Sequence, residues 1–523
     1  MARLRKILVV GGGTAGWLTA CYLAKVVNAK APGSTDVALV ESPRIGLLGV
    51  GEATFPSIRG TLSAIGLDEC SFLARTGATF KQGILYRDWV RSPGEPGRSE
   101  FFHPFSLPNQ RSGGQELLPY WLLGMAPGDM AFAEAVTLQS RLVDGNRGPK
   151  RSADADFQGA MNYAYHIDAA RVAEVLADHG QTELGVKRHL ATVEHVSLDE
   201  QGNIEHIATR EAGRLDADLY IDCTGLHGKL IGEAMHSPFQ SRRDVLFADR
   251  AVAMQVPYPQ VDAPIPSYTM ASAQTAGWIW DIGLQDRRGV GYVYSSAHST
   301  KDEAETLFRQ HLGDAAAGIE AQHIRFETGY RPEHWRKNCV AVGLAGGFVE
   351  PLESTGIALV ELGAYLIAHL LPGDTDDMER AARHYNQMVV ARYDRIIDFI
   401  KMHYCLSQRR DSAFWVDNTM ASTVPETLQD KLALWKHRPP HRLDFVSDLE
   451  MFQVASWQYV LYGMEFRTEL EPMRTAYPHA EEAQREFRMI QQVAEHALRD
   501  LPGHRALVEQ MVQRSRTRGG RFL

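Results

Sequence analysis

The stretch ILVVGGGTAGW, from Ile7 to Trp17, joins a continuous apolar run to a glycine-rich turn and then to a helical pattern. Four apolar residues in a row are typical of a parallel strand that is buried on both faces. A second apolar run, Val37 to Val40, ends at Glu41. Strand, helix and strand in this order predict a βαβ unit, and therefore an α/β fold that starts close to the amino terminus.

The glycines of this turn follow the pattern GxGxxG. Glycine at these positions permits a tight turn and the close approach of a pyrophosphate, and the next helix offers free N–H groups to the phosphates. The same spacing occurs in ordinary turns, but here the strand, the helix and Glu41 stand in register. A carboxylate at Glu41 favours FAD or NAD over NADP, because it would repel a 2′-phosphate. The residues predicted to line the cofactor here are Gly11, Gly13, Thr14, Ala15, Gly16 and Glu41.

Two later segments favour FAD over NAD. LYIDCTG, which begins at Leu219, and NCVAVG, which begins at Asn338, resemble the two strand ends that return to the same nucleotide in two-domain flavoproteins. We therefore predict bound FAD in a Rossmann-like domain. The remaining residues of the predicted cofactor site are Gly51, Ala53, Gly343 and Leu344.

The rest of the chain is predicted to add a mixed sheet and a helical lobe. Strand-like runs cover 192–197, 219–222, 278–284 and 291–294, and the last two are expected to pair through Arg287–Gly289. From Gly356 the pattern is mostly helical, with a long helix over 378–406. We expect a core over residues 1–375, a substrate-contacting excursion at about 91–165, and a helical lobe over 376–523 that covers the substrate site.

Composition excludes several classes of function. The 523 residues carry 55 Lys+Arg against 64 Asp+Glu, a net charge of −9, which is the wrong sign for binding nucleic acid or an anionic membrane. The apolar stretch from Ile357 to Leu371 contains Glu361 and His369 and is shorter than the roughly 20 residues of a membrane span. Five scattered cysteines without metal-ligand spacing favour a reducing compartment, so a cytoplasmic protein without a metal site is expected.

The sequence resembles the flavin-dependent tryptophan halogenase family through motifs that run from Gly11 to about Gly463. They are GGGTAGW, GVGEATFP (49–56), ATFKQGI (78–84), GWIWDI (277–282), GYVYSS (291–296) and GGFVEPLESTGI (346–357). The resemblance implies that reduced FAD and oxygen give a flavin hydroperoxide, that halide converts it to hypohalous acid, and that this acid travels through a tunnel to an aromatic substrate.

The resemblance also implies the catalytic residues. Lys81 matches the family's tunnel lysine, whose amine can hydrogen-bond hypohalous acid or form a haloamine; outside such a motif, a lysine is usually a solvated surface charge. Glu353 matches the accompanying carboxylate, and Glu350 is the competing choice. Thr355 and Gly356 match the halide site at the start of a helix, where Ser354 and Thr355 could equally serve as simple caps.

Aromatic motifs are expected to form the tunnel and the substrate pocket. Trp278 and Trp280 lie two residues apart and face one side of a strand; core packing is the default explanation, whereas the family places them beside the tunnel. Gly283 departs from the family, which has proline at this position. The departure weakens the argument that this tryptophan motif excludes a monooxygenase. The predicted substrate residues are His103, Phe105, Phe452 and Trp457.

The expected substrate is an indole or a phenol rather than free tryptophan. Relatives that act on tryptophan carry paired tyrosines and a glutamate in the segment that here reads HRLDFVSDLEMFQVASW, which lacks the tyrosine pair. Because the only GxGxxG is assigned to FAD, a separate NAD(P)H-dependent flavin reductase is the expected partner. Two alternatives stay open, a single-component aromatic monooxygenase and a non-catalytic FAD-binding protein, and a homodimer stays open as the assembly.

Overall fold

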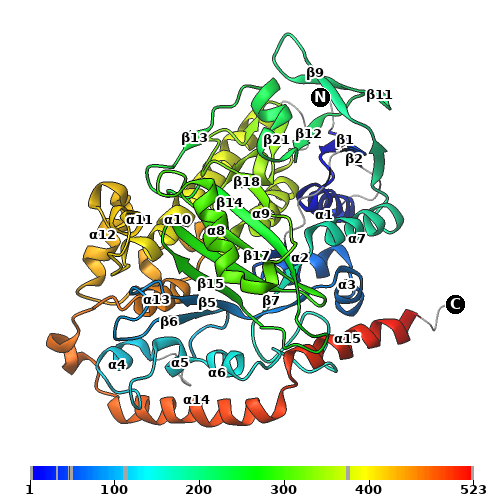
Figure 1. Ribbon diagram of the computed structural model, residues 1–523. Coiled ribbons are helices and arrows are strands. Elements are labelled where there is room, and N and C mark those ends of the chain that lie inside the picture. Colours follow the sequence, from blue (N-terminus) through cyan, green and yellow to red (C-terminus); the bar gives the residue numbers. More distant parts are fainter. Residues whose placement is uncertain are drawn as a thin grey trace. The chain divides into compact units, whose positions relative to one another are not determined.

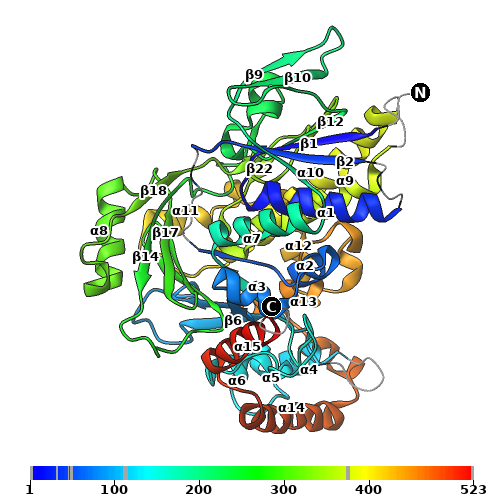
Figure 2. The same cartoon turned by 90° about the vertical axis from the view of Figure 1, so that its right-hand side faces the viewer.

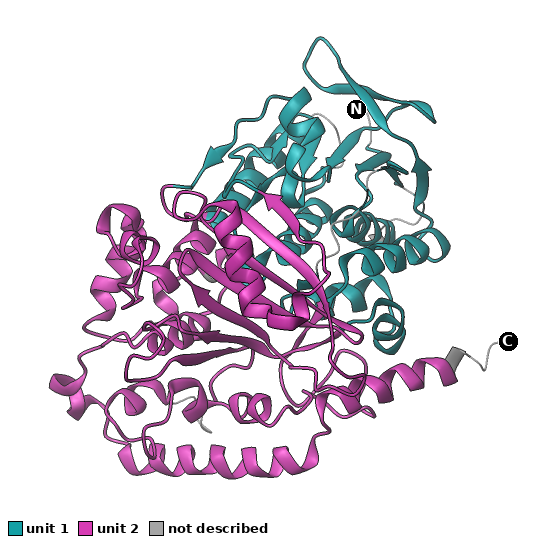
Figure 3. Ribbon diagram, in the orientation of Figure 1, with its two compact units in different colours: residues 1–78, 167–243, 326–393 teal, residues 79–166, 244–325, 394–523 magenta. Residues whose placement is uncertain are grey.

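The computed structural model describes residues 4–30, 33, 35–44, 46, 51–109, 116–372 and 377–519. They form two compact units, each assembled from three separate stretches of chain (Figure 3). Unit 1 comprises Met1–Ala78, Ile167–Arg243 and Phe326–Tyr393, and unit 2 comprises Thr79–His166, Asp244–Arg325 and Asp394–Leu523. The boundary expected at residue 375 falls inside the last stretch of unit 1, and the division into a core and a covering helical lobe stays a prediction.

Unit 1 is built on a six-stranded sheet in the order β20-β21-β12-β1-β2-β8 (Figure 1). All neighbouring strands are parallel except β20, which runs antiparallel to β21. The predicted first strand forms as β1, and Ile7 to Val10 are buried as expected of a strand covered on both faces. The strands are β1 (Lys6–Val10), β2 (Asp36–Glu41), β8 (Lys187–Leu190), β12 (Leu219–Asp222), β20 (Trp335–Arg336) and β21 (Cys339–Ala341).

Helices α1, α7 and α9 pack together in unit 1 (Figure 2). Helix α7 begins where the Asp168 carboxylate accepts the amide hydrogens of Ala170 and Arg171. Within the described residues, every helix is too short or too polar to span a membrane. The helices of this unit are α1 (Thr14–Lys30), α2 (Ile58–Ile65), α3 (Glu69–Thr76), α7 (Ala169–Thr182), α9 (Thr355–Leu370) and the first part of α10 (Met378–Cys405).

Two smaller antiparallel sheets complete unit 1. One has the order β11-β10-β9 and the other β13-β19-β22. The predicted strand over 192–197 forms as β9, one residue later than expected. The strands of these two sheets are β9 (Val193–Leu198), β10 (Ile204–Thr209), β11 (Gly213–Leu215), β13 (Gln240–Ser241), β19 (Gly329–Tyr330) and β22 (Gly347–Phe348). Strand β3 (Glu52–Ala53) belongs to neither sheet.

Unit 2 contains the predicted mixed sheet, with seven strands in the order β18-β14-β17-β16-β15-β5-β6. Strands β15 and β5 run parallel and the other neighbours run antiparallel. A short antiparallel pair of β4 and β7 lies in the same unit. The strands are β4 (Thr79–Lys81), β5 (Gly83–Arg87), β6 (Glu100–Pro104), β7 (Ala164–Ile167), β14 (Arg250–Pro257), β15 (Thr269–Gln274), β16 (Gly277–Gly283), β17 (Arg287–Tyr294) and β18 (Gln322–Arg325).

The predicted hairpin forms, but its connection was placed wrongly. Arg287 to Gly289 belong to β17, whose pairing with β16 extends to Gly283 opposite Arg288. The turn is residues 284–286, closed by the Leu284 amide donating to the Arg287 carbonyl at 2.8 Å. The polar run suggested a turn, yet Arg288 reaches Asp281 at 2.6 Å across the two strands, so the charged residues stabilise the pairing instead.

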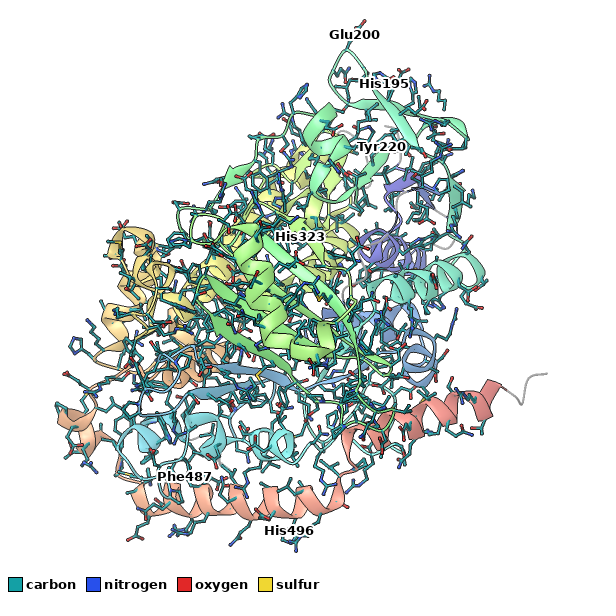
Figure 4. All side chains as sticks on the ribbon, in the orientation of Figure 1. His195, Glu200, Tyr220, His323, Phe487 and His496 are labelled. Carbon is teal, nitrogen blue, oxygen red and sulfur yellow. The ribbon has the colours of Figure 1, made fainter. Side chains whose placement is uncertain are left out.

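Helices make up most of the remainder of unit 2, as predicted for the carboxy-terminal region. Helix α14 packs against α5 and α6 with Phe487 fully buried, whereas His496 lies exposed on the same helix (Figure 4). The long helix expected over 378–406 is α10. The other helices are α4 (Leu118–Leu122), α5 (Phe132–Val136), α6 (Gln139–Asp144), α8 (Lys301–Leu312), α11 (Ala413–Asn418), α12 (Glu426–Trp435), α13 (Val454–Gly463), α14 (Ala480–Asp500) and α15 (His504–Gly519).

Candidate active site

The carboxyl ends of the parallel strands in unit 1 converge on the glycine-rich turn. The Gly11 amide donates to the Val40 carbonyl at 2.9 Å, and the Cys223 amide donates to the Val10 carbonyl at 2.8 Å. The Val342 amide donates to the Asp222 carbonyl at 3.0 Å. The segments predicted from their sequences to reach one nucleotide therefore meet at one edge of the sheet, where ligands of this fold bind.

Backbone crowding explains two of the glycines in this turn. Gly11 has a φ of 119°, and a Cβ atom there would lie 2.3 Å from the Cys223 carbonyl oxygen. A Cβ atom at Gly16 would lie 1.8 Å from the Gly11 carbonyl oxygen. The turn passes directly into α1 at Thr14, whose hydroxyl donates to the Ala169 carbonyl at 3.0 Å. The loop thus presents backbone to a ligand at the amino end of α1, which suits a pyrophosphate.

Glu41 ends β2 as predicted and lies over the glycine turn. A Cβ atom at Gly12 would come within 1.5 Å of one of its carboxylate oxygens. Two side chains donate to the carboxylate, Arg188 Nε at 2.5 Å and Trp17 Nε1 at 3.4 Å. Sequence reasoning missed Arg188, because it comes from β8, far along the chain. The ion pair orients Glu41 at the position where a ribose hydroxyl would be bound.

The other predicted cofactor residues of unit 1 fall into two groups. Gly343 has a φ of 69°, and a Cβ atom added there would lie 3.1 Å from Ala15 Cβ. This strand end therefore lies beside the glycine turn. Leu344 follows it and is 40% exposed. Gly51 is buried and Ala53 half-buried at β3, whereas Gly49 and Val50 of the same motif lie outside the described residues. The turn, the acidic residue and the returning strand end fit a flavin dinucleotide.

Lys81 ends β4 in unit 2 and has no exposed surface. Its Nζ lies 5.0 Å from the centroid of the Phe105 ring, and the Phe105 amide donates to the Gln82 carbonyl at 3.0 Å. The default view of a lysine as a solvated surface charge is therefore wrong for Lys81. Burial of an amine is costly because it loses its hydration, and this makes Lys81 a candidate functional residue.

His166 was not predicted, yet it shares a face of the β4–β7 pair with Lys81. In the strand register Lys81 lies opposite Ala164, and Thr79 lies opposite His166. Burial lowers the pKa of His166 well below its usual value, and the nearby charge of Lys81 lowers it further. His166 Nε2 lies 2.9 Å from the Thr269 hydroxyl. A neutral imidazole therefore stands beside the amine.

Three of the four predicted substrate residues belong to one aromatic series in unit 2, whereas the fourth, Phe105, lies beside Lys81. The ring centroid of His103 lies 6.0 Å from that of Phe399. Phe399 in turn stacks on Phe452 at 3.9 Å and meets Trp457 edge-on at 4.9 Å. Trp457 is 1% exposed. Sequence reasoning missed Phe399, which comes from α10 and connects the residues that had been predicted.

Trp278 and Trp280 face one side of β16 as predicted, with ring centroids 6.4 Å apart. Trp278 also lies 6.4 Å from Trp89 in a fully buried cluster, so core packing accounts for it. Trp280 lies over Gly291 of β17, where a Cβ atom would be 2.2 Å from its ring. At Gly283 a Cβ atom would lie 2.8 Å from the Tyr258 hydroxyl, so a larger residue here would require that side chain to move.

Glu353 lies in unit 1, immediately before α9, and is 1% exposed. Ser354 takes a left-handed conformation with φ 59° and makes no side-chain capping hydrogen bond, so the interpretation of this residue as a simple cap is wrong. Thr355 is buried, whereas Gly356 is exposed with open space beside its α-carbon. The first turn of α9 accordingly offers backbone N–H groups of the kind that bind anions. Glu350 is also buried, so burial does not distinguish the two glutamates.

These features define an oxidoreductase that combines a dinucleotide-binding α/β unit with a second unit carrying a buried amine among aromatic rings. The chain belongs to the tryptophan halogenase family, whose sequence profile matches residues 6–479. Members of this family are flavin-dependent halogenases, so the protein is an enzyme, and neither a monooxygenase nor a non-catalytic flavin-binding protein is favoured.

Individual relatives agree along nearly the whole chain. A tryptophan 6-halogenase of Streptomyces toxytricini is 38% identical over 457 residues, which are 83% of this chain and 84% of that protein. The crystal structure of a tryptophan halogenase from Shewanella frigidimarina superimposes with a TM-score of 0.93 at 39% identity and covers 98% of both chains. A flavin-dependent halogenase from a Brevundimonas species gives a TM-score of 0.85 at 34% identity, over 97% of this chain and 99% of that one.

Proposed function

We propose that the protein halogenates an electron-rich indole or phenol with chloride or bromide, and that Lys81 and Glu353 are its catalytic residues. When bound, reduced FAD with oxygen and halide supplies hypohalous acid. The observation that carries the proposal is the complete burial of Lys81 against Phe105. A buried amine can hold hypohalous acid by a hydrogen bond, or as a haloamine, beside one carbon of an aromatic ring, and position then governs the site of substitution.

The other site residues have supporting roles in this proposal. Glu353 accepts the proton that the ring carbon loses after attack. The first turn of α9 at Thr355 and Gly356 binds the halide. The aromatic series from His103 to Trp457 stacks on the substrate ring, which is worth about 1 kcal/mol per pair beyond the buried area.

Two carboxylates of the segment before α13, Glu450 and Asp444, support a substrate without the amino-acid zwitterion. Arg395 Nε donates to Glu450 at 2.8 Å, and the side chain of Glu450 is only 7% exposed. Arg438 Nη1 donates to Asp444 at 2.9 Å, and Asp444 also accepts from Trp435 Nε1 at 3.0 Å. Each of these carboxylates already faces an arginine, so binding a substrate ammonium would have to compete with an existing ion pair.

A substrate panel tests the proposal. The protein is supplied with FAD, a flavin reductase, oxygen and either halide, and initial rates are measured by mass spectrometry for tryptophan, indole and a phenol. We expect kcat/KM for indole to exceed that for tryptophan by at least about tenfold, because the charged ammonium of tryptophan would be left poorly paired. A higher value for tryptophan would show the substrate assignment to be wrong. Hydroxylated products without halide would instead favour a monooxygenase.

The same assay on Lys81→Met tests the catalytic assignment. Ring halogenation should fall by about 100-fold or more while oxidation of reduced flavin continues, because only placement of the electrophile is lost. The matched control is Lys401→Met, since Lys401 is also fully buried and donates to Asn418 Oδ1 at 2.9 Å. Retained halogenation in Lys81→Met would remove the lysine from the mechanism.

The partner and the setting are part of the proposal. A separate flavin reductase supplies reduced FAD by diffusion. All five cysteines are free thiols, which suits the reducing cytoplasm as the place of reaction. The candidate assembly is a homodimer, and sedimentation would measure its mass directly.

A further inference from the structure

The strand that carries Lys81 is only three residues long. It spans Thr79 to Lys81 and pairs on one side with β7. A short strand has few hydrogen bonds of its own, so its neighbours determine how firmly it is held. The residues on both sides of Lys81 are tied to distant parts of unit 2.

His504, the first residue of α15, holds the residue before Lys81. Its ring is fully buried and joins two segments of unit 2. The Phe80 amide donates to His504 Nε2 at 3.1 Å, and His504 Nδ1 lies 2.8 Å from the Ile265 carbonyl oxygen. The ring centroids of Phe80 and His504 are 6.0 Å apart. The carboxy-terminal helix therefore supplies a hydrogen bond to the backbone of the lysine strand.

The chemistry of the two partners determines the tautomer of His504. A carbonyl oxygen only accepts, so Nδ1 carries the proton and donates to Ile265. A backbone amide only donates, so Nε2 is the unprotonated acceptor. Burial lowers the pKa of His504 to about 4, and the neighbouring Arg505 lowers it as well. The ring stays neutral near pH 7 and keeps its acceptor for Phe80.

Gln82, the residue after Lys81, is held by the same two segments. The Gln82 amide donates to the Ser267 carbonyl at 2.7 Å, and its side chain donates to the Arg147 carbonyl at 2.8 Å. The His504 amide donates to the Asn146 carbonyl at 3.0 Å, next to that Arg147. Lys81 is thus held between two anchors that share the 146–147 loop and the 265–267 segment.

We propose that His504 is a positioning residue, which places the amine of Lys81 for halogen transfer by fixing the Phe80 amide. The proposal rests on the proposed function of Lys81. It makes the start of the carboxy-terminal helix part of the halogenating site, although His504 touches neither substrate nor cofactor. Without the His504 ring, the Lys81 side chain would no longer be held in one position, and hypohalous acid would be released before it reaches the substrate.

The test compares His504→Ala, His504→Gln and Leu507→Ala. We measure halogenated product per reduced flavin consumed, and hypohalous acid captured by an external trap. His504→Ala should lower the product yield by about 10-fold and raise the trapped acid, as a displaced reacting group would. His504→Gln should stay within about threefold of the wild type, because a carboxamide can accept from Phe80 and donate to Ile265.

Leu507→Ala is the matched control for a structural effect. Leu507 is also fully buried in α15 and packs against Gly148, but its side chain has no group that can hydrogen-bond to β4. It should lower the melting temperature like His504→Ala while keeping the product yield. An equal loss of yield in Leu507→Ala, or a wild-type yield in folded His504→Ala, would overturn the proposal. If His504→Ala does not fold, a more than tenfold loss of yield in folded His504→Gln would overturn it too.

The Lys81→Met variant separates the two proposals. If it keeps halogenation, the proposed function of Lys81 fails whatever His504 does. If it abolishes halogenation while His504→Ala keeps the wild-type yield, only the positioning role fails. The affinity for FAD should be unchanged in all variants, because every predicted cofactor residue lies in unit 1.

Discussion

At the scale of single residues, the proposed chemistry depends on two buried charged side chains. Lys81 and Glu353 are both within 1% of complete burial. Groups of this kind are rarely buried without a partner or a function, because they lose their hydration. Sequence identified both residues through motifs, and the structure shows that neither is an ordinary surface charge.

The two buried glutamates before α9 give a prediction at the same scale. Glu353→Gln keeps the shape of the side chain but removes the base, so kcat should fall by about 100-fold. Glu350→Gln is the matched control, because Glu350 is equally buried three residues away, and its kcat should change by less than about threefold. Initial rates of product formation decide between them. A larger loss in Glu350→Gln would exchange the two assignments.

At the scale of elements, one buried carboxyl joins two helices of unit 1. Glu361 of α9 accepts hydrogen bonds from the Ser57 hydroxyl at 2.9 Å and from the Thr61 hydroxyl of α2 at 2.5 Å. Burial raises the pKa of Glu361 from 4.5 to about 7, although the two hydroxyls act in the opposite direction. From sequence this residue appeared only as an interruption of an apolar run.

The raised pKa of Glu361 predicts a pH-dependent stability. The folded state holds its proton more tightly than the unfolded state, so this stabilisation is complete below pH 4.5 and is lost as pH rises through 7. Glu361→Gln cannot ionise and should be more stable than the wild type at pH 8 by about 1–3 kcal/mol, with little difference at pH 5. Thermal unfolding at both pH values measures this.

The control for this prediction is Glu379→Gln, because Glu379 is exposed in the first turn of α10. Its melting temperature should follow that of the wild type at both pH values. A gap between Glu361→Gln and the wild type that does not widen from pH 5 to pH 8 would contradict the assignment of the titrating group.

For the whole molecule, we predict that this chain does not itself accept hydride from NAD(P)H, because its GxGxxG motif is assigned to FAD. Purified protein with NADH, FAD, oxygen and halide should oxidise NADH far more slowly than the complete system forms product. Addition of a flavin reductase should restore turnover, and so should FAD reduced by light without any reductase. NADH oxidation by the protein alone at the rate of turnover would show that the expected partner is not needed.

Local sequence was sufficient where neighbours along the chain define the structure. The apolar run before Gly11 predicted β1, the glycine spacing predicted the turn, and Glu41 was placed at the end of β2, because strands and turns depend on short-range patterns. The connection at Arg287 was misjudged because charged residues that pair across strands look like a turn when the partner strand is unknown.

The site residues divide in the same way. Lys81 and Glu353 stand in recognisable motifs, but nothing near Arg188, Phe399 or His504 in the sequence indicates their partners. Arg188 meets Glu41 across 147 residues, and His504 meets Phe80 across 424 residues. Contacts between residues so far apart in the sequence form only when the whole unit packs together. Short-range sequence patterns therefore cannot predict them. The candidate catalytic residues could thus be predicted from motifs along the chain, whereas the contacts that position them form only in the folded protein, because they join segments far apart in the sequence.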